Sequence, residues 1–344
     1  MTKDKTILIQ NVYYMLSYAF QELRKNNYED IAKEEFEYVQ DLFAEIIYKG
    51  ISAQLKRGLH REYVERRENL SALKGRLDIR GSIINRINCR SLLKCDYDEL
   101  LEDNKLNQVL KTTLSVLLQG SYVKKMRKNR LRKLMPFFSE VKVLDIRSIN
   151  WNNIVYQRNN QSYRMLINLC YFILDGMLMT TETGTYRLAT FSEEHMNRLF
   201  ERFVLEYYRV HHKYLSANPD KIYWNVDDVS MIDFLPEMKT DIVLHRGEHT
   251  LIIDTKYYGT TLQTHFNKST IHSSNMYQIF TYVKNFDMGN SGNVSGLLLY
   301  AKTDEDISPD FSAVFDKNMI SVKTLDLNQQ FSVIAKQLDS FIEL

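Results

Sequence analysis

The sequence is poor in the residues that interrupt a chain or cross-link it. It has four prolines and 12 glycines in 344 residues, and no stretch rich in either marks a linker between domains. The three cysteines, Cys89, Cys95 and Cys170, are scattered and form no Cys-x-x-Cys pair. We therefore expect reduced thiols and no zinc site.

Two further absences exclude whole classes of protein. No apolar run approaches the roughly 18 residues that a membrane-spanning helix needs, and the opening residues lack the apolar core of a signal peptide. We expect a cytoplasmic protein with no membrane contact. No Gly-x-x-x-x-Gly-Lys-Ser/Thr run occurs, so the chain itself should not bind a nucleoside triphosphate through a P-loop.

The nearly balanced net charge of +2 hides an asymmetry between the two halves. Residues 1–150 carry 28 Lys and Arg against 20 Asp and Glu, whereas residues 151–344 carry 17 against 23. The length suggests two domains, which we place at 1–150 and 151–344. The basic half can meet nucleic acid or an acidic protein surface, and the acidic half should bind DNA poorly unaided.

The most informative stretch is 238–258, where two apolar runs of strand length flank a polar turn containing Gly247. This pattern predicts a β-hairpin. With Gly247 and Glu248 at the tip, Asp241 lies directly opposite Asp254, with Cβ atoms about 5 Å apart. Lys256 is two residues beyond Asp254 and shares its face. One face of the sheet therefore gathers two carboxylates and an ammonium.

These three side chains suit a metal-dependent phosphodiesterase. Two close carboxylates repel each other unless a proton or cation lies between them, and their oxygens are ligands that Mg²⁺ or Mn²⁺ prefers. A lysine beside the metal can position or deprotonate a water, or neutralise charge developing on a phosphate. The alternative is a solvated hairpin with a cross-strand salt bridge.

The pattern Asp241-x12-Asp254-x-Lys256 resembles the PD-(D/E)xK nuclease superfamily. This resemblance implies a restriction-endonuclease-like second domain, with a central mixed sheet flanked by helices. It further implies that Glu201, on the helix before the sheet, joins Asp241 and Asp254 at the metal. Glu201 is otherwise an exposed helix residue near two arginines.

The helix expected from Ser273 or Ser274 carries Gln278 and Tyr282 four residues apart on one face. This pair resembles the Gln-x3-Tyr element of RecB-like members of the superfamily. There it supports the site or contacts DNA.

The first half carries charged segments whose function the sequence leaves open. Lys74 and Arg76, in a segment with strand-like alternation, belong to a solvated face or reach a partner. The acids from Asp96 to Asp103, which include Asp98 and Glu99, should cap the following helix or contact a partner. Between Lys124 and Lys133 seven of ten residues are basic, which fits phosphate binding, a solvated helix face or an acidic partner.

Three first-half motifs resemble the McrC family, the subunits of McrBC-type restriction systems. They are the run Asn11-Val12-Tyr13-Tyr14-Met15-Leu16-Ser17-Tyr18-Ala19, the run Lys74-Gly75-Arg76-Leu77, and Asp98-Glu99-Leu100 followed by Asn104, Asn107, Leu110 and Lys111. Together with the nuclease pattern, the similarity extends over nearly the whole chain.

The McrC resemblance implies a mixed α/β first domain that docks on a separate McrB-type AAA+ GTPase. The partner would bind GTP, recognise double-stranded DNA and have its GTP hydrolysis stimulated by this chain. Candidate docking residues are Lys74, Arg76, Asp98 and Glu99. The chain would then be a Mg²⁺-dependent DNA endonuclease subunit, and the sequence leaves open whether cleavage depends on 5-methylcytosine.

Two other functions remain open at the level of sequence. One is an activator or adaptor whose nuclease site is vestigial, against which the intact Asp241, Asp254 and Lys256 argue. The other is a stand-alone RecB-like repair nuclease, which would cleave DNA without GTP or a partner.

Overall fold

The computed structural model describes residues 9–20, 23, 30–31, 34–156, 160, 162–175, 178–180, 186–188, 193–226, 234–257, 262–265, 268–302 and 309–343. The chain divides into two compact units: unit 1 comprises Met1–Leu42 and Ala189–Leu344, and unit 2 comprises Phe43–Leu188. This division differs from the predicted domains 1–150 and 151–344. The reason is that helix α1 (Ile9–Ala19) packs on helix α8 (Glu193–His211), so the start of the chain joins the unit formed by its end.

Unit 1 is built on a five-stranded mixed sheet. Its strands, in the order β13-β14-β12-β9-β8, are β13 (Phe311–Phe315), β14 (Asn318–Leu325), β12 (Val294–Ala301), β9 (His249–Lys256) and β8 (Ile242–Arg246). The two inner pairs are parallel, and the two outer pairs are antiparallel. The central mixed sheet expected from the sequence is therefore present.

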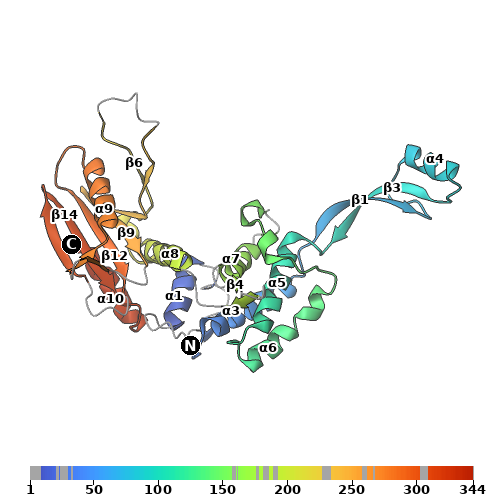
Figure 1. Cartoon of the computed structure of the whole chain (residues 1–344), viewed down its shortest axis with the longest axis horizontal. Coiled ribbons are helices and arrows are strands. Elements are labelled where there is room, and N and C mark those ends of the chain that lie inside the picture. The colour runs from blue at the N-terminus through green and yellow to red at the C-terminus, as the bar shows by residue number, and fades with distance from the viewer. Residues whose placement is uncertain are drawn as a thin grey trace. The chain divides into compact units, whose positions relative to one another are not determined.

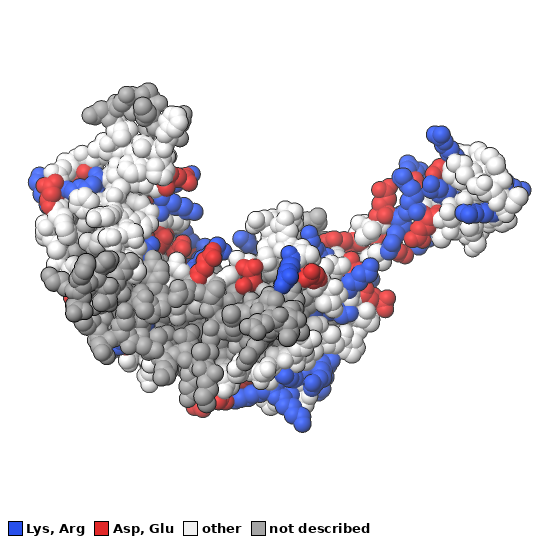
Figure 2. All heavy atoms as spheres, in the orientation of Figure 1, with Lys and Arg blue, Asp and Glu red and all other residues white. Residues whose placement is uncertain are grey.

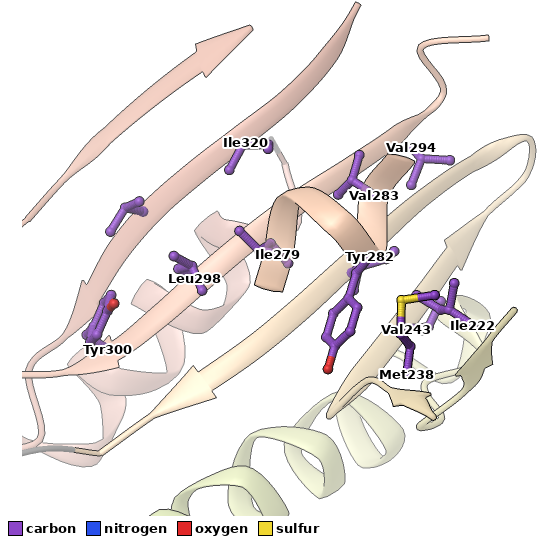
Figure 3. Close-up of a cluster of buried hydrophobic side chains, with 12 residues drawn as sticks. Ile222, Met238, Val243, Ile279, Tyr282, Val283, Val294, Leu298, Tyr300 and Ile320 are labelled. Atoms are coloured by element: carbon purple, nitrogen blue, oxygen red, sulfur yellow. The ribbon is translucent and has the colours of Figure 1, made fainter. Parts of the chain in front are cut away.

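Helix α9 (Ser273–Phe286) packs against the sheet through a buried apolar cluster (Figure 3). Its residues Ile279 and Val283 come so close to Gly296 of β12 that a Cβ atom there would lie 2.8 Å from each side chain. Such a distance is too short for any larger residue without movement of the helix. The glycine at position 296 therefore allows α9 to pack closely on β12.

The remaining elements of unit 1 complete its layers. Helix α10 (Phe331–Phe341) packs on β14. Two short antiparallel pairs are formed by β6 (Lys221–Ile222) with β7 (Met238–Lys239), and by β10 (Leu262–His265) with β11 (Lys268–Ile271). A 3-10 turn, η6 (Lys213–Leu215), follows α8.

Several sequence predictions for unit 1 are confirmed. The hairpin has the predicted register, with Arg246 opposite His249 and Leu244 opposite Leu251. The helix at Ser273 is present. The apolar patterns of the sequence also predict a buried strand from Val294 and a closing helix from Phe331 to Phe341, and both are present. The sequence also predicts that the apolar run from Ile7 begins as a strand and that Ser192 caps a helix, and both Ile7 and Ser192 lie outside the described residues.

The body of unit 2 is helical. It contains α3 (Val39–Leu55), α5 (Lys105–Gln119), α6 (Lys125–Arg132) and α7 (Tyr163–Leu174), with the 3-10 turns η2 (Met135–Phe138), η3 (Ile146–Ser148) and η4 (Trp151–Asn153). A short strand pair, β4 (Leu178–Thr180) with β5 (Tyr186–Leu188), follows α7. In the basic run, Arg127 and Arg130 contact the buried carboxylate of Glu45, so these two side chains stabilise the unit internally.

A β-sheet arm, residues 62–101, extends from these helices (Figure 1). Strands β1 (Glu62–Leu70) and β3 (Leu93–Leu101) form its long hairpin, β2 (Arg76–Leu77) pairs with β3, and α4 (Ile79–Ile87) lies at its end. Acidic and basic side chains alternate along it (Figure 2).

Asp96, Asp98 and Glu99 of the acidic stretch lie on strand β3, so the prediction that they cap the next helix is wrong. Contact with a partner, the alternative, stays a prediction. Asp96 pairs with Arg67 of β1 at 2.9 Å and with Arg76 of β2 at 3.1 Å. The cap of α5 is Asn104, whose side chain accepts a hydrogen bond from the backbone of Asn107. Cross-strand ion pairs between residues about 20 to 30 positions apart have no local signal.

Candidate active site

Strand β9 places Asp254 and Lys256 on the sheet face that α9 covers. Side chains alternate along a strand, and Ile252, two residues earlier, belongs to the cluster under α9. Asp254 is 1% exposed. Lys256 Nζ forms an ion pair with Asp254 Oδ2 at 2.8 Å.

Asp241 lies one position before β8, where the β8–β9 ladder ends at Ile242 and Ile253. Its Oδ2 accepts hydrogen bonds from the backbone N–H of Thr255 at 2.7 Å and from the Thr255 hydroxyl at 2.9 Å. The carboxylate thus takes the place of a main-chain acceptor at the end of the ladder. It is held beside the strand that carries Asp254.

Helix α9 adds a relay of hydrogen bonds to the same place. Lys256 Nζ donates to Gln278 Oε1 at 3.2 Å, and Gln278 Nε2 donates to the Tyr282 hydroxyl at 2.8 Å. The Tyr282 hydroxyl donates in turn to the carbonyl oxygen of Lys239 at 3.0 Å. The predicted pair on one helix face is therefore in contact with the predicted lysine.

Glu201, on α8, belongs to the same electrostatic environment. Burial raises the pKa of Glu201 to about 7, and the negative charge of Asp241 contributes in the same direction. Lys239 and Lys256 oppose this rise of the pKa. The structure thus brings Glu201 into the electrostatic field of the other predicted site residues.

Asp254 shows the same excess of negative charge. Burial, followed by the charge of Asp241, raises the pKa of Asp254 above its ordinary value, and the opposing effect of Lys256 is smaller. Asp254 is ion-paired with Lys256, while Asp241 and Glu201 add two further carboxylates to the same environment. A bound cation would relieve this repulsion.

The donor set fits a hard divalent cation bound by few protein ligands. Among the described residues, no three His, Cys, Asp or Glu side chains are gathered closely enough to hold a metal by themselves. Mg²⁺ commonly takes only one or two carboxylates and completes its shell with water and phosphate oxygens. Asp254 Oδ2 already contacts Lys256 Nζ at 2.8 Å, so a bound cation would share this buried carboxylate with the lysine.

Lys239 and Asn197 were not predicted as residues of this site, and neither was the role of the Thr255 hydroxyl. The Thr255 hydroxyl orients Asp241, the Lys239 carbonyl anchors Tyr282, and Asn197 of α8 accepts a hydrogen bond from the backbone N–H of Tyr257 at 2.9 Å. Thr255 and Lys239 lie within two residues of the predicted carboxylates, so closeness in sequence was the signal that could have identified them. Asn197 has no local signal.

The predicted docking residues lie in unit 2, on the arm. Lys74 pairs with Glu99 at 3.3 Å and Arg76 with Asp96 at 3.1 Å, while Asp98 is exposed. None of them belongs to the site of unit 1. Among the described residues, no helix has the length and apolar character needed to cross a membrane.

Comparison with known proteins extends over the whole chain. Residues 3–301 match the family model of the McrBC 5-methylcytosine restriction system component. The chain is 28% identical over 350 residues to the type IV methyl-directed restriction enzyme EcoKMcrBC of Escherichia coli (strain K12), covering 98% of this chain and 97% of that protein.

A solved structure shares the fold. It is a refined half-complex from the tetradecameric assembly of Thermococcus gammatolerans McrB AAA+ hexamers with bound McrC. Its TM-score is 0.56 at 19% sequence identity, and the match covers 97% of this chain and 75% of that chain. With the family match over most of its length, the chain belongs to the family of McrBC 5-methylcytosine restriction system components.

Proposed function

We propose that this chain is the nuclease subunit of a two-component restriction system and hydrolyses phosphodiester bonds of double-stranded DNA. The observation that carries the proposal is the gathering of Asp241, Asp254 and Lys256 at one end of a mixed sheet. Membership of a restriction-system family supports it, as does similarity to a protein named as a methyl-directed restriction enzyme.

The finer proposal for the fold is a PD-(D/E)xK core. Three features support it: the mixed sheet with α8 and α9 packed on β9, the acid–acid–lysine pattern on the β8–β9 hairpin, and the Gln278–Tyr282 pair on the next helix. In this proposal Asp241, Asp254 and Lys256 are catalytic, while Gln278 and Tyr282 support them.

Asp241 and Asp254 would hold Mg²⁺, or Mn²⁺ in its place. Glu201, the third ligand expected from the sequence, interacts with them electrostatically, but among the described residues no three such side chains are gathered closely enough to bind one metal. The metal would supply Lewis-acid stabilisation of the phosphate. Thr255 orients Asp241, and Gln278 holds the ammonium of Lys256 beside Asp254. That ammonium positions the attacking water and offsets the negative charge that grows on the phosphate.

The proposed partner is an AAA+ GTPase of the McrB type, which would bind the GTP and read the DNA, including its methylation. The Thermococcus gammatolerans assembly of McrB AAA+ hexamers with bound McrC supports this proposal. This chain would dock through unit 2 and stimulate the partner's GTP hydrolysis.

The arm of unit 2 offers a surface for docking. Helix α4 leaves Ile79, Ile83 and Ile87 each more than half exposed, which is unusual for aliphatic residues on one short helix. Lys74 and Arg76 are exposed beside this helix.

The test is a cleavage assay on methylated and unmethylated plasmid with Mg²⁺ and GTP. It compares this chain, the AAA+ GTPase encoded beside it, and the two mixed. Cleavage only in the mixture, lost with Asp241→Ala while GTPase stimulation persists, is the expected result. Cleavage by this chain alone would indicate a stand-alone repair nuclease, and no cleavage with intact GTPase stimulation would indicate an adaptor.

A further inference from the structure

Lys239 has its backbone tied to the candidate active site. It ends strand β7, two residues before Asp241, and its carbonyl oxygen accepts the 3.0 Å hydrogen bond from Tyr282. Through Gln278 the same relay holds Lys256. The relay therefore links the main chain of Lys239 to the side-chain ammonium of Lys256 through Gln278 and Tyr282 on α9.

The side chain of Lys239 differs from those of its neighbours. It is exposed, and within the described part of the chain its ammonium has no hydrogen-bond or ion-pair partner. By contrast, Lys221, directly opposite on β6, pairs with Glu237, and Lys256 pairs with Asp254. Lys239 is thus a cation beside the site with no short contact in the protein.

The charge of the site gives this cation a role. Glu201, Asp241 and Asp254 present three carboxylates against the single ion-paired Lys256, and a DNA backbone that approaches them is repelled. Burial alternates from Met238 to Asp241, with Met238 and Thr240 buried, so Lys239 and Asp241 project to the same side of the chain. An exposed ammonium in this position can bind a phosphate as a point charge.

We propose that Lys239 binds the DNA phosphate adjacent to the scissile phosphodiester and holds the backbone over Asp241 and Asp254. This inference rests on the proposed nuclease function and adds a DNA-contacting residue outside the Asp241-x12-Asp254-x-Lys256 pattern. The Tyr282 hydroxyl fixes the base of the Lys239 side chain, so this contact is positioned by the same relay as Lys256.

The experiment uses the full chain assembled with its AAA+ GTPase partner. Equilibrium binding of double-stranded DNA is measured over a range of NaCl concentrations without divalent metal, so that it does not depend on hydrolysis. The variants are Lys239→Ala, Lys239→Arg and the control Lys336→Ala. Lys336 is another exposed lysine without a hydrogen-bond or ion-pair partner in the described part of the chain, on α10.

Loss of one phosphate contact should reduce the slope of log affinity against log salt by about 1. With Mg²⁺ and GTP, Lys239→Ala should lower kcat/KM for cleavage about tenfold, mainly through KM, and Lys239→Arg should restore most of it. Lys336→Ala should leave the slope and kcat/KM unchanged.

Two outcomes overturn the inference. One is a salt slope for Lys239→Ala equal to that of Lys336→Ala. The other is a fall in kcat/KM for Lys239→Ala without a change of the salt slope, which would show that Lys239 acts on Glu201 and does not bind a DNA phosphate. Failure of the wild-type complex to cleave DNA would refute the nuclease proposal separately, because the salt slope is measured without cleavage.

Discussion

Replacing Asp254 with Asn should stabilise the metal-free protein while it abolishes DNA cleavage. Asp254 is 1% exposed, and its pKa is raised by burial and by Asp241 even with Lys256 beside it. The ionised carboxylate is therefore a net cost in the folded state at pH 8. Asn has nearly the same shape and carries no charge, and Lys256 keeps its hydrogen bond to Gln278.

The size of the effect follows from the difference between the folded and unfolded pKa of Asp254. A pKa that rises by one on folding corresponds to about 1.4 kcal/mol. The pKa of Asp254 rises from 3.8 to about 7, so relief of the buried charge should add about 4 kcal/mol to the free energy of unfolding. For a protein of this size we expect Tm to rise by about 4–8 °C. The pKa of Asp254 is higher in the folded protein than its unfolded value of 3.8. The loss of stability caused by the buried charge is therefore absent below pH 3.8, and it grows as pH rises toward the folded pKa and is complete above it.

The assay is thermal unfolding in EDTA at pH 8 and at pH 4, repeated at pH 8 with excess Mg²⁺. The Tm advantage of Asp254→Asn should be present at pH 8 and vanish toward pH 4. Mg²⁺ should raise the Tm of the wild type and not that of the variant, because ligand binding to the folded state stabilises it. A variant less stable than the wild type at pH 8 in EDTA would refute the reasoning.

Three further predictions concern other parts of the chain. Asp287→Asn should lower the free energy of unfolding by about 3 kcal/mol at pH 7, because its carboxylate accepts four hydrogen bonds, from Ser291, Gly292 and Asn318. Those bonds hold the pKa of Asp287 well below 3.8. The difference in unfolding free energy between wild type and variant, measured by urea unfolding, should therefore shrink only as pH falls below 3.8. A constant difference from about pH 7 to about pH 2 would contradict this. Gly75 has φ +69°, and the Cβ atom of an alanine there would lie 2.6 Å from the Cβ of Tyr97. Gly75→Ala should therefore speed amide hydrogen exchange in β1 and β3 and leave exchange in β9 and β12 unchanged. Exchange in the arm equal to that of the wild type would show that the arm tolerates the methyl group. Gln278→Leu removes the hydrogen bond to the ammonium of Lys256. It should lower kcat for cleavage about tenfold while Tm stays within about 2 °C of the wild type. An unchanged kcat would show that the relay does not position Lys256.

The sequence predicted the elements whose signal is local. The register of the β8–β9 hairpin followed from apolar alternation and from Gly247, whose φ of +62° suits the turn. Helices α9 and α10 followed from apolar spacing. The contact of Gln278 with Tyr282 followed from the four-residue repeat of a helix.

Features that depend on distant segments were not predictable from one sequence. Asn11 donates hydrogen bonds to the carbonyl oxygens of Leu327 and Gln329, more than 300 residues away, which helps to place the start of the chain in unit 1. The orientation of Asp241 depends on where the β8–β9 ladder ends. Strand β3 was missed because its acids pair with basic residues of β1 and β2 rather than with near neighbours in sequence.

The central claim is that Lys256 and its two carboxylates form the site of DNA hydrolysis. The most direct measurement compares plasmid cleavage by the wild-type and Lys256→Ala chains, each assembled with the AAA+ GTPase partner, while GTP hydrolysis is followed in the same reaction. We predict loss of cleavage with Lys256→Ala at an unchanged rate of GTP hydrolysis. Cleavage by the Lys256→Ala complex at the wild-type rate would contradict the account.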